Sequence, residues 1–301
     1  FRSKPMLVLQ LAYSGELDFV EELQELKELL KKKHIIIGVV ESLEGKTHVI
    51  KVMCDDSNYS DRTGNIINLY ISNILYKIVI TKYKEKELFE YLTDTYFFLK
   101  RDEMLEVEEE IMKVLYCEEG VHDSNFIFYS NKTNAIIDKI KECIEENNEI
   151  NINGFITFRM RELRKDIEDV VDKVVERYMV EKEYKEFIRL LKYFVEIQEC
   201  RVEEINLTAL PSGGYIVTDG YGEDIFPTFL NELSDCKIGI DANVEDIVIS
   251  GLITNAPQKI VIHKREECKN KEFIETIINV FGERVVFCDG CKLCSKTNIK
   301  M

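Results

Sequence analysis

The longest helical pattern of hydrophobic positions lies between residues 155 and 199, in a stretch without proline or glycine. Large apolar residues recur there every three or four positions, first in a stripe that ends at Tyr178 and then in a stripe that begins at Tyr184. This spacing places apolar side chains along one face of a helix, which is then buried against a core. The six-residue step between the stripes breaks the helical phase. We therefore expect a kink, or two abutting helices, near residues 180–182.

Short apolar runs predict a small sheet in the N-terminal part of the chain. Residues 6–13, 34–41 and 47–53 are typical of strands, and the last two are expected to form a hairpin whose turn contains Gly45. Residues 16–33 carry apolar side chains at helical spacing. The sheet is therefore expected to alternate with a helix along the chain.

A mainly helical region follows, and it ends at a polar stretch. Helices are expected over most of 65–98, from near Arg101 onward and over 135–146, with loops around 118–124 and 130–134. The residues from Glu145 to Gly154 form the clearest polar break in the sequence.

The last hundred residues return to strands and turns. Strands are expected at 204–210, 215–219, 258–263 and 284–287, and helices at 229–233, 246–255 and 271–281. The strand, helix and strand from 258 to 287 form a crossover unit, so its two strands are expected to be parallel and adjacent.

These patterns predict an α+β protein with an N-terminal α/β portion, a central helical segment and a C-terminal α/β portion with a Cys-rich tail. We expect the boundaries 6–150, 151–200 and 201–301, the last region ending in C-x-x-C-x-x-C. The chain has 301 residues, of which 45% are hydrophobic and 32% charged, which is typical of a globular protein with a sizeable core.

The charge balance disfavours several classes of partner. The formal net charge is −16, and residues 203–246 hold ten acidic residues against one basic residue. Such a surface repels nucleic-acid phosphates and anionic membranes. No signal-peptide pattern opens the chain, and no apolar run approaches the roughly 20 residues of a membrane helix. We therefore expect a cytoplasmic protein with no nucleic-acid partner and no membrane span.

The Gly45-Lys46-Thr47 sequence resembles the end of a phosphate-binding loop. That motif requires another glycine five residues before Gly45, where this chain has Val40. It also requires a helix start that presents backbone N–H groups to the phosphate, and the pattern here is that of a hairpin. A nucleotide site is therefore not expected.

The last part of the chain carries the strongest metal-binding signal. Cys288, Cys291 and Cys294 are spaced C-x-x-C-x-x-C directly after an expected strand, and a turn at this spacing can aim the thiols at one metal ion. A fourth ligand is available in Cys268 or His263, both of which follow the neighbouring strand. Zinc is favoured over an iron–sulfur cluster, and a redox dithiol is the third alternative. Unligated thiols in a flexible tail remain the competing interpretation.

The central segment also carries a resemblance. Its second half, VEKEYKEFIRLLKYFVEIQ, and the later stretch LITNAPQKIVIH resemble the YtxC-like family, which is associated with sporulation in endospore-forming bacteria. The resemblance implies a cytosolic, sporulation-associated protein, and it supplies no catalytic residues because no mechanism is established for that family.

No catalytic set is evident in the sequence, so a non-enzymatic interaction or structural protein with an unidentified protein partner is the leading hypothesis. The alternative is a metal-binding or redox module that uses the C-terminal cysteines. The oligomeric state stays open. Arg159 could help to clamp an anion or could pair with acidic residues. The other polar residues of the central segment to test first are Glu183, Tyr184 and Gln198.

Overall fold

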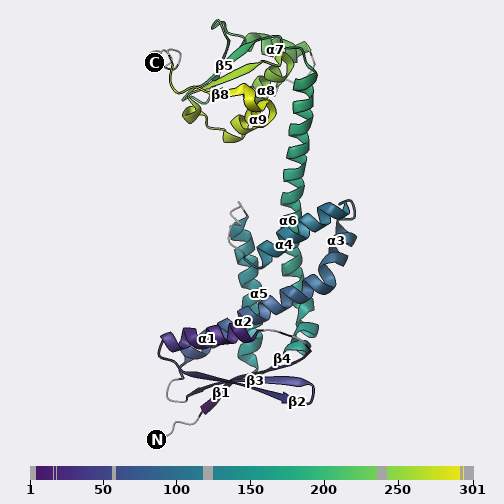
Figure 1. The fold of residues 1–301 in the computed structure, drawn as a ribbon, viewed down its shortest axis with the longest axis vertical. Coiled ribbons are helices and arrows are strands. Elements are labelled where there is room, and N and C mark those ends of the chain that lie inside the picture. The colour runs from purple at the N-terminus through teal and green to yellow at the C-terminus, as the bar shows by residue number, and fades with distance from the viewer. Residues whose placement is uncertain are drawn as a thin grey trace. The chain divides into compact units, whose positions relative to one another are not determined.

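The computed structural model describes residues 5–15, 17, 19–55, 59–117, 125–235, 243–291 and 294. The chain divides into two compact units, Phe1–Tyr178 and Met179–Met301. Each unit contains a four-stranded sheet together with helices (Figure 1). The α+β class expected from the sequence is confirmed.

The sheet of the first unit has the order β2-β3-β1-β4. Its strands are β1 (Pro5–Ser14), β2 (Ile37–Glu44), β3 (Thr47–Asp55) and β4 (Glu149–Asn151). β2 and β3 form the predicted hairpin, and Gly45 sits in its turn with φ +68°. The Gly45-Lys46-Thr47 sequence therefore belongs to a hairpin and not to a phosphate-binding loop. β4 pairs parallel to β1 inside the polar break, where the sequence indicated no strand.

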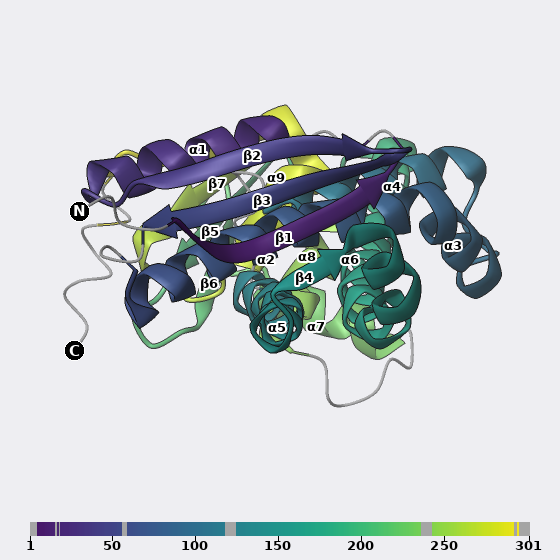
Figure 2. The ribbon, with the colours of Figure 1, turned by 90° about the horizontal axis from the view of Figure 1, so that it is seen from below.

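Helices α1 (Val20–Lys32) and α2 (Asp61–Tyr83) lie on the same side of this sheet (Figures 1 and 2). Alternate residues of β1, among them Leu9, Leu11 and Tyr13, are buried, as expected for a strand with one face on a core. A single π-helical segment (Lys84–Leu88) joins α2 to α3 (Phe89–Thr95), and α4 (Arg101–Leu115) follows.

Helix α5 (Phe126–Glu146) begins earlier than the sequence predicted, and the loop expected at 130–134 is wrong. The segment is rich in polar residues, but Tyr129, Thr133 and Ile136 are all buried on one face. Helical spacing of buried side chains therefore outweighs the low helix propensity of Ser and Asn. The other expected loop, 118–124, lies outside the described residues.

Helix α6 (Ile152–Ile197) is continuous through residues 180–182, so the expectation of two abutting helices is wrong. Its earlier buried positions, such as Ile167 and Val174, belong to the first unit, whereas Ile188 and Val195 belong to the core of the second. The phase step in the sequence therefore marks a change of core along one helix.

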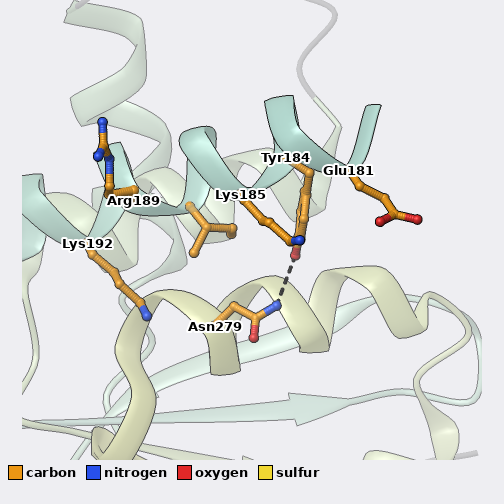
Figure 3. Close-up of a pocket in the computed structure, with 7 residues that line it drawn as sticks. Glu181, Tyr184, Lys185, Arg189, Lys192 and Asn279 are labelled. Atoms are coloured by element: carbon orange, nitrogen blue, oxygen red, sulfur yellow. Dashed lines mark hydrogen bonds between the residues drawn. The ribbon is translucent and has the colours of Figure 1, made fainter. Parts of the chain in front are cut away.

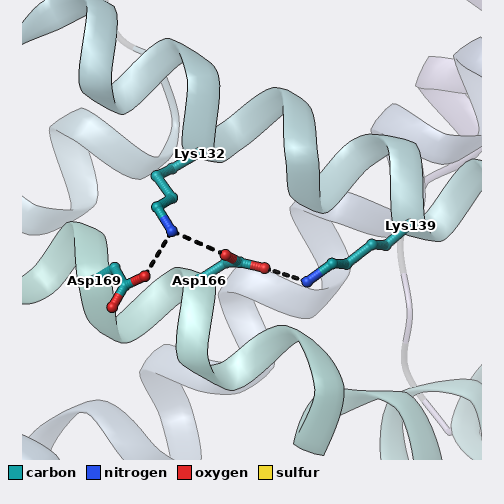
Figure 4. Close-up of polar contacts among 4 residues, drawn as sticks. All are labelled: Lys132, Lys139, Asp166 and Asp169. Atoms are coloured by element: carbon teal, nitrogen blue, oxygen red, sulfur yellow. Dashed lines mark hydrogen bonds and ion pairs between the residues drawn. The ribbon is translucent and has the colours of Figure 1, made fainter.

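A network of charges connects α5 to α6 within the first unit (Figure 4). Lys132 Nζ lies 3.1 Å from Asp166 Oδ1 and 2.6 Å from Asp169 Oδ2, and Lys139 pairs with the other oxygen of Asp166. Burial alone would raise the pKa of Asp166, but its hydrogen bonds to Lys139 and Lys132 hold that pKa below its usual value. The carboxylate is therefore stabilised in its charged form.

The sheet of the second unit has the order β6-β5-β7-β8. Its strands are β5 (Glu204–Ala209), β6 (Tyr215–Asp219), β7 (Lys259–His263) and β8 (Val285–Phe287). β5 and β6 are antiparallel, whereas β7 is parallel to both β5 and β8. The two strands expected at 204–210 and 215–219 form a hairpin, and the predicted crossover is confirmed.

The described residues of the second unit also form the helices α7 (Phe226–Asp235), α8 (Val244–Asn255) and α9 (Lys271–Phe281). Phe229 of α7, Leu252 of α8 and Ile277 of α9 are buried in one core with Ile262 of β7. The approach of α7 to α8 depends on Gly251, where a Cβ atom would overlap the Phe229 ring. In the part of the chain that the structure describes, no helix has the length and apolarity to cross a membrane.

Candidate metal centre

The candidate centre forms where two parallel strands end side by side. Ile262 pairs with Phe287 across β7 and β8, and the N–H of Cys288 donates to the carbonyl of Ile262 at 2.9 Å. His263, the last residue of β7, is therefore a close neighbour of Cys288. The crossover through α9 brings together residues that are 25 positions apart in the sequence.

His263, Cys288, Cys291 and Cys294 form a candidate metal-binding group, with their ligand atoms within 4.8 Å of one another. His263 Nδ1 lies 3.5 Å from the sulfurs of both Cys291 and Cys294. Cys294 Sγ lies 3.9 Å from the sulfurs of both Cys288 and Cys291. The four donors thus converge from four sequence positions on one small volume.

These separations match the edges of a zinc coordination tetrahedron. With Zn–S bonds of about 2.3 Å and a Zn–N bond of about 2.0 Å, neighbouring sulfurs lie about 3.8 Å apart and a sulfur and nitrogen about 3.5 Å apart. The observed 3.9 Å and 3.5 Å differ from these values by about 0.1 Å or less. Four of the six donor–donor separations therefore fit a tetrahedral ion of this size, and the two that join Cys288 to His263 and to Cys291 are within 4.8 Å.

The turn after β8 is shaped around the first thiol. Gly290 has φ +120°, a conformation that side chains rarely allow, and its N–H points to Cys288 Sγ at 3.4 Å. That N–H favours the thiolate, but burial and the hydrogen bonds to Cys291 and Cys294 outweigh it and raise the pKa of Cys288. Thiols this close oppose one another's ionisation unless a cation lies among them.

The other ring nitrogen of His263 is held from the sheet. His263 is 3% exposed, and its Nε2 lies 3.0 Å from Asn206 Oδ1 on β5. Burial lowers the pKa of His263, while the nearby Glu204 carboxylate acts in the opposite direction. A histidine with a lowered pKa is neutral at neutral pH, and neutral imidazole is the form that binds metals. The sequence analysis missed Asn206, whose amide is one of three polar side chains that alternate with apolar ones along β5 and carries no motif of its own.

Cys268, the other fourth ligand considered from the sequence, is not among the grouped donors. Its sulfur lies 3.2 Å from the Tyr215 hydroxyl and 3.1 Å from the carbonyl of Asn270. The Tyr215 hydroxyl in turn donates to Glu245 at 2.9 Å. Of the five candidate ligands, the structure brings four together and gives Cys268 separate partners.

The polar candidates of the central helix are not brought together into one site. Arg159 belongs to the first unit and pairs with Glu162, three residues further along α6, at 2.8 Å. Glu183 is exposed on α6, and Gln198 is exposed directly after the end of that helix.

Tyr184 lines a groove of about 500 Å³ between α6 and α9 (Figure 3). Its hydroxyl accepts a hydrogen bond from Asn279 Nδ2 at 3.2 Å. Lys185, Arg189 and Lys192 also line this groove, so it is mainly cationic. Arg189 pairs with Glu186 beside it.

Comparisons with known proteins agree with the resemblance seen in the sequence. A model of the YtxC-like family matches residues 69–286, which is more than half of the chain. The uncharacterized protein YtxC of Bacillus subtilis (strain 168) is 23% identical over 227 residues, covering 73% of this chain and 76% of that protein. No solved structure matches the chain. The family match ends before Cys288, so the three cysteines are features of this chain that the match does not cover.

Proposed function

Because this chain belongs to the YtxC-like family, for which no activity is specified, we propose a function from the chemistry of its own residues. The second unit binds one zinc ion through His263, Cys288, Cys291 and Cys294. The ion holds the segment after β8 against the end of β7. Its role is structural.

The convergence of four donors within 4.8 Å, with four of their six separations at tetrahedral values, is the observation that carries this proposal. Three thiolates and one imidazole fill all four positions of zinc, which leaves none for a substrate or an activated water. A closed set of this kind is typical of structural sites, whereas catalytic zinc keeps an open position.

Zinc is favoured over an iron–sulfur cluster by the mixed donor set. Such clusters are commonly held by four thiolates. Cys268 would have to complete that set, but its thiol is hydrogen-bonded to the Tyr215 hydroxyl and the Asn270 carbonyl. A redox dithiol is less consistent with the geometry. Thiols of that type act at a helix N-terminus, whereas Cys288 directly follows β8.

Metal analysis of untagged full-length protein, purified anaerobically, tests the proposal. One zinc per chain is expected, with little iron, and Cys291→Ser is expected to lose it. Substoichiometric zinc and iron, together with free titration of the thiols of Cys288, Cys291 and Cys294, would overturn the proposal.

We also propose that the protein is cytoplasmic, sporulation-associated and non-enzymatic, and that it acts by binding a protein partner. The supporting observation is an exposed apolar stripe on the second half of α6: Val180, Phe187, Leu190, Phe194 and Ile197. Their spacing of seven, three, four and three residues is that of a helix seam that packs on another helix. A different face of the helix, with Ile188 and Val195, already packs in the core of the second unit.

A pull-down from sporulating cells tests this second proposal. Phe187→Glu is expected to lose the partner without unfolding the protein, because Phe187 is 51% exposed. Phe158→Glu is the matched control, since Phe158 is 79% exposed on the same helix but lies outside the stripe. Recovery of no partner, or equal recovery with both variants, would count against the proposal.

A further inference from the structure

We infer that Asn206 is a positioning residue for the metal centre, which fixes the proton of His263 on Nε2 so that Nδ1 presents its lone pair to the ion. The inference rests on the proposed zinc binding and assigns to that site a residue from a third strand. It also specifies which ring nitrogen binds the metal.

The orientation of the Asn206 amide follows from its surroundings. Its nitrogen Nδ2 lies 3.1 Å from the carbonyl oxygen of Asp219 and 3.4 Å from Glu204 Oε1. Both of these oxygens only accept hydrogen bonds, so the NH₂ group must face them. A flipped amide would place two oxygens in contact at 3.1 Å.

The orientation of the amide decides the tautomer of His263. With NH₂ facing Asp219, the remaining oxygen Oδ1 faces His263 Nε2 at 3.0 Å. An amide oxygen cannot donate, so Nε2 must carry the proton. A neutral imidazole has only one N–H, which leaves Nδ1 as the unprotonated nitrogen. That is the atom 3.5 Å from the sulfurs of Cys291 and Cys294.

The strand register explains why an asparagine occurs here. β5 runs parallel to β7, with Asn206 opposite Val261 and Thr208 opposite His263. Asn206 is 7% exposed, and burying an amide costs free energy unless its hydrogen bonds are made. Its oxygen and both N–H groups have partners here, so the amide is satisfied while it orients the imidazole. Metal-bound histidines almost always donate their second N–H in this way.

Zinc-affinity measurements on matched variants can separate a positioning role of Asn206 from a general effect of its substitution on stability. Zinc affinity of the full chain is measured by competition with a chromophoric chelator for the wild type, Asn206→Leu and Asn255→Leu. Asn255 is the matched control, because it is a 5%-exposed amide of the same unit bonded to Glu232 and Gly251. We expect Asn206→Leu to weaken zinc binding by roughly 10- to 100-fold, the usual loss for an outer-shell partner of a ligand. Asn255→Leu should leave the affinity of the folded protein within about twofold of wild type.

The same substitution in a His263→Cys variant provides a second comparison, which stays informative if Asn206→Leu lowers stability. In His263→Cys the fourth ligand is a thiolate, which has no tautomer to fix. Adding Asn206→Leu there should cost no more than about twofold in affinity, because distant or uncoupled substitutions are additive. Nitrogen-15 NMR of labelled histidine should show the His263 proton on Nε2 in the wild-type zinc complex.

The outcomes distinguish the two proposals. Absence of zinc binding by the wild type defeats the proposed function, and the positioning role falls with it. Tight zinc binding by the wild type with an unchanged Asn206→Leu affinity, or a proton found on Nδ1, defeats only the role of Asn206. An equal loss in the His263→Cys background also defeats it, because Asn206 would then act through the fold.

Discussion

Removal of the proposed zinc ion is expected to destabilise the second unit and to leave the first unchanged. All four donors lie within Met179–Met301. β8 has only three residues, and its Val286 and Phe287 are 43% and 36% exposed. Burial therefore contributes little to holding this strand end, and the ion becomes a principal restraint on it.

The size of the effect follows from linkage. Zinc present at about 100 times its dissociation constant stabilises the folded state by about 2.7 kcal/mol. For a unit of about 120 residues, 1 kcal/mol corresponds to roughly 3–5 °C in the unfolding midpoint. Chelation should therefore lower the midpoint of the second unit by about 10 °C.

Differential scanning calorimetry of the full chain, with excess zinc or excess chelator, measures this shift. The transition that moves should also be the one lowered in Cys291→Ser, and that variant should no longer respond to the chelator. A shift below about 2 °C in wild type, or an equal shift in both transitions, would refute a structural ion confined to the second unit.

Three further predictions concern single side chains. Gly251→Ala should lower the stability of the second unit by about 1–3 kcal/mol in urea unfolding, because the new methyl group overlaps the buried Phe229 ring; unchanged stability would contradict this packing. The pKa of Asp166 is lowered in the folded protein. Its charged carboxylate therefore stabilises the first unit at any pH above its pKa in the unfolded chain, about 3.9, and this stabilisation is lost as the pH falls through the lower pKa of the folded protein. Asp166→Asn should therefore cost about 1 kcal/mol at pH 7 and flatten the acid dependence of unfolding, and a variant with the wild-type pH profile would disprove this role. Cys268→Ser should retain full zinc content whereas Cys291→Ser loses it, and equal loss in both would place Cys268 among the ligands.

The sheets could be predicted from the sequence where hydrophobic alternation is strong. The β2–β3 hairpin and the β7–α9–β8 crossover were both expected, because each strand has its own apolar run and a clear turn or helix beside it. β4 could not be expected in this way. It has three residues, only Ile150 is buried, and its pairing with β1 uses backbone groups that leave no pattern in the side chains.

Helix α6 shows how periodicity can mislead. The absence of proline and glycine between 155 and 199 favoured one helix, whereas the phase step after Tyr178 suggested two. The step arises because the buried face changes with the core, and a single sequence does not reveal which core a residue joins. Residues of the second stripe, such as Phe187, are consequently exposed although their helical spacing predicts burial.

At the candidate metal centre, the cysteine spacing and the crossover rule were sufficient to nominate His263 as well as the three thiols. The choice between His263 and Cys268 depended on contacts distant in the sequence. Nothing near Cys268 indicates that the Tyr215 hydroxyl approaches its sulfur. The same holds for Asn206, whose role depends on a neighbouring strand more than fifty residues away.

Because of the crossover that assembles the donors, an ion bound as proposed would be a removable cross-link. An ion that joins His263 to Cys288 closes a loop of about 25 residues around α9, and by the chain-entropy relation for disulfides such a closure restricts the unfolded chain by roughly 3–4 kcal/mol. The donors meet only after α9 has packed and β8 has paired with β7. Metal binding would therefore be a late step in folding, which stabilises strands and helices that have already packed. A competing chelator could remove this cross-link without oxidising or reducing the cysteines, unlike the breaking of a disulfide.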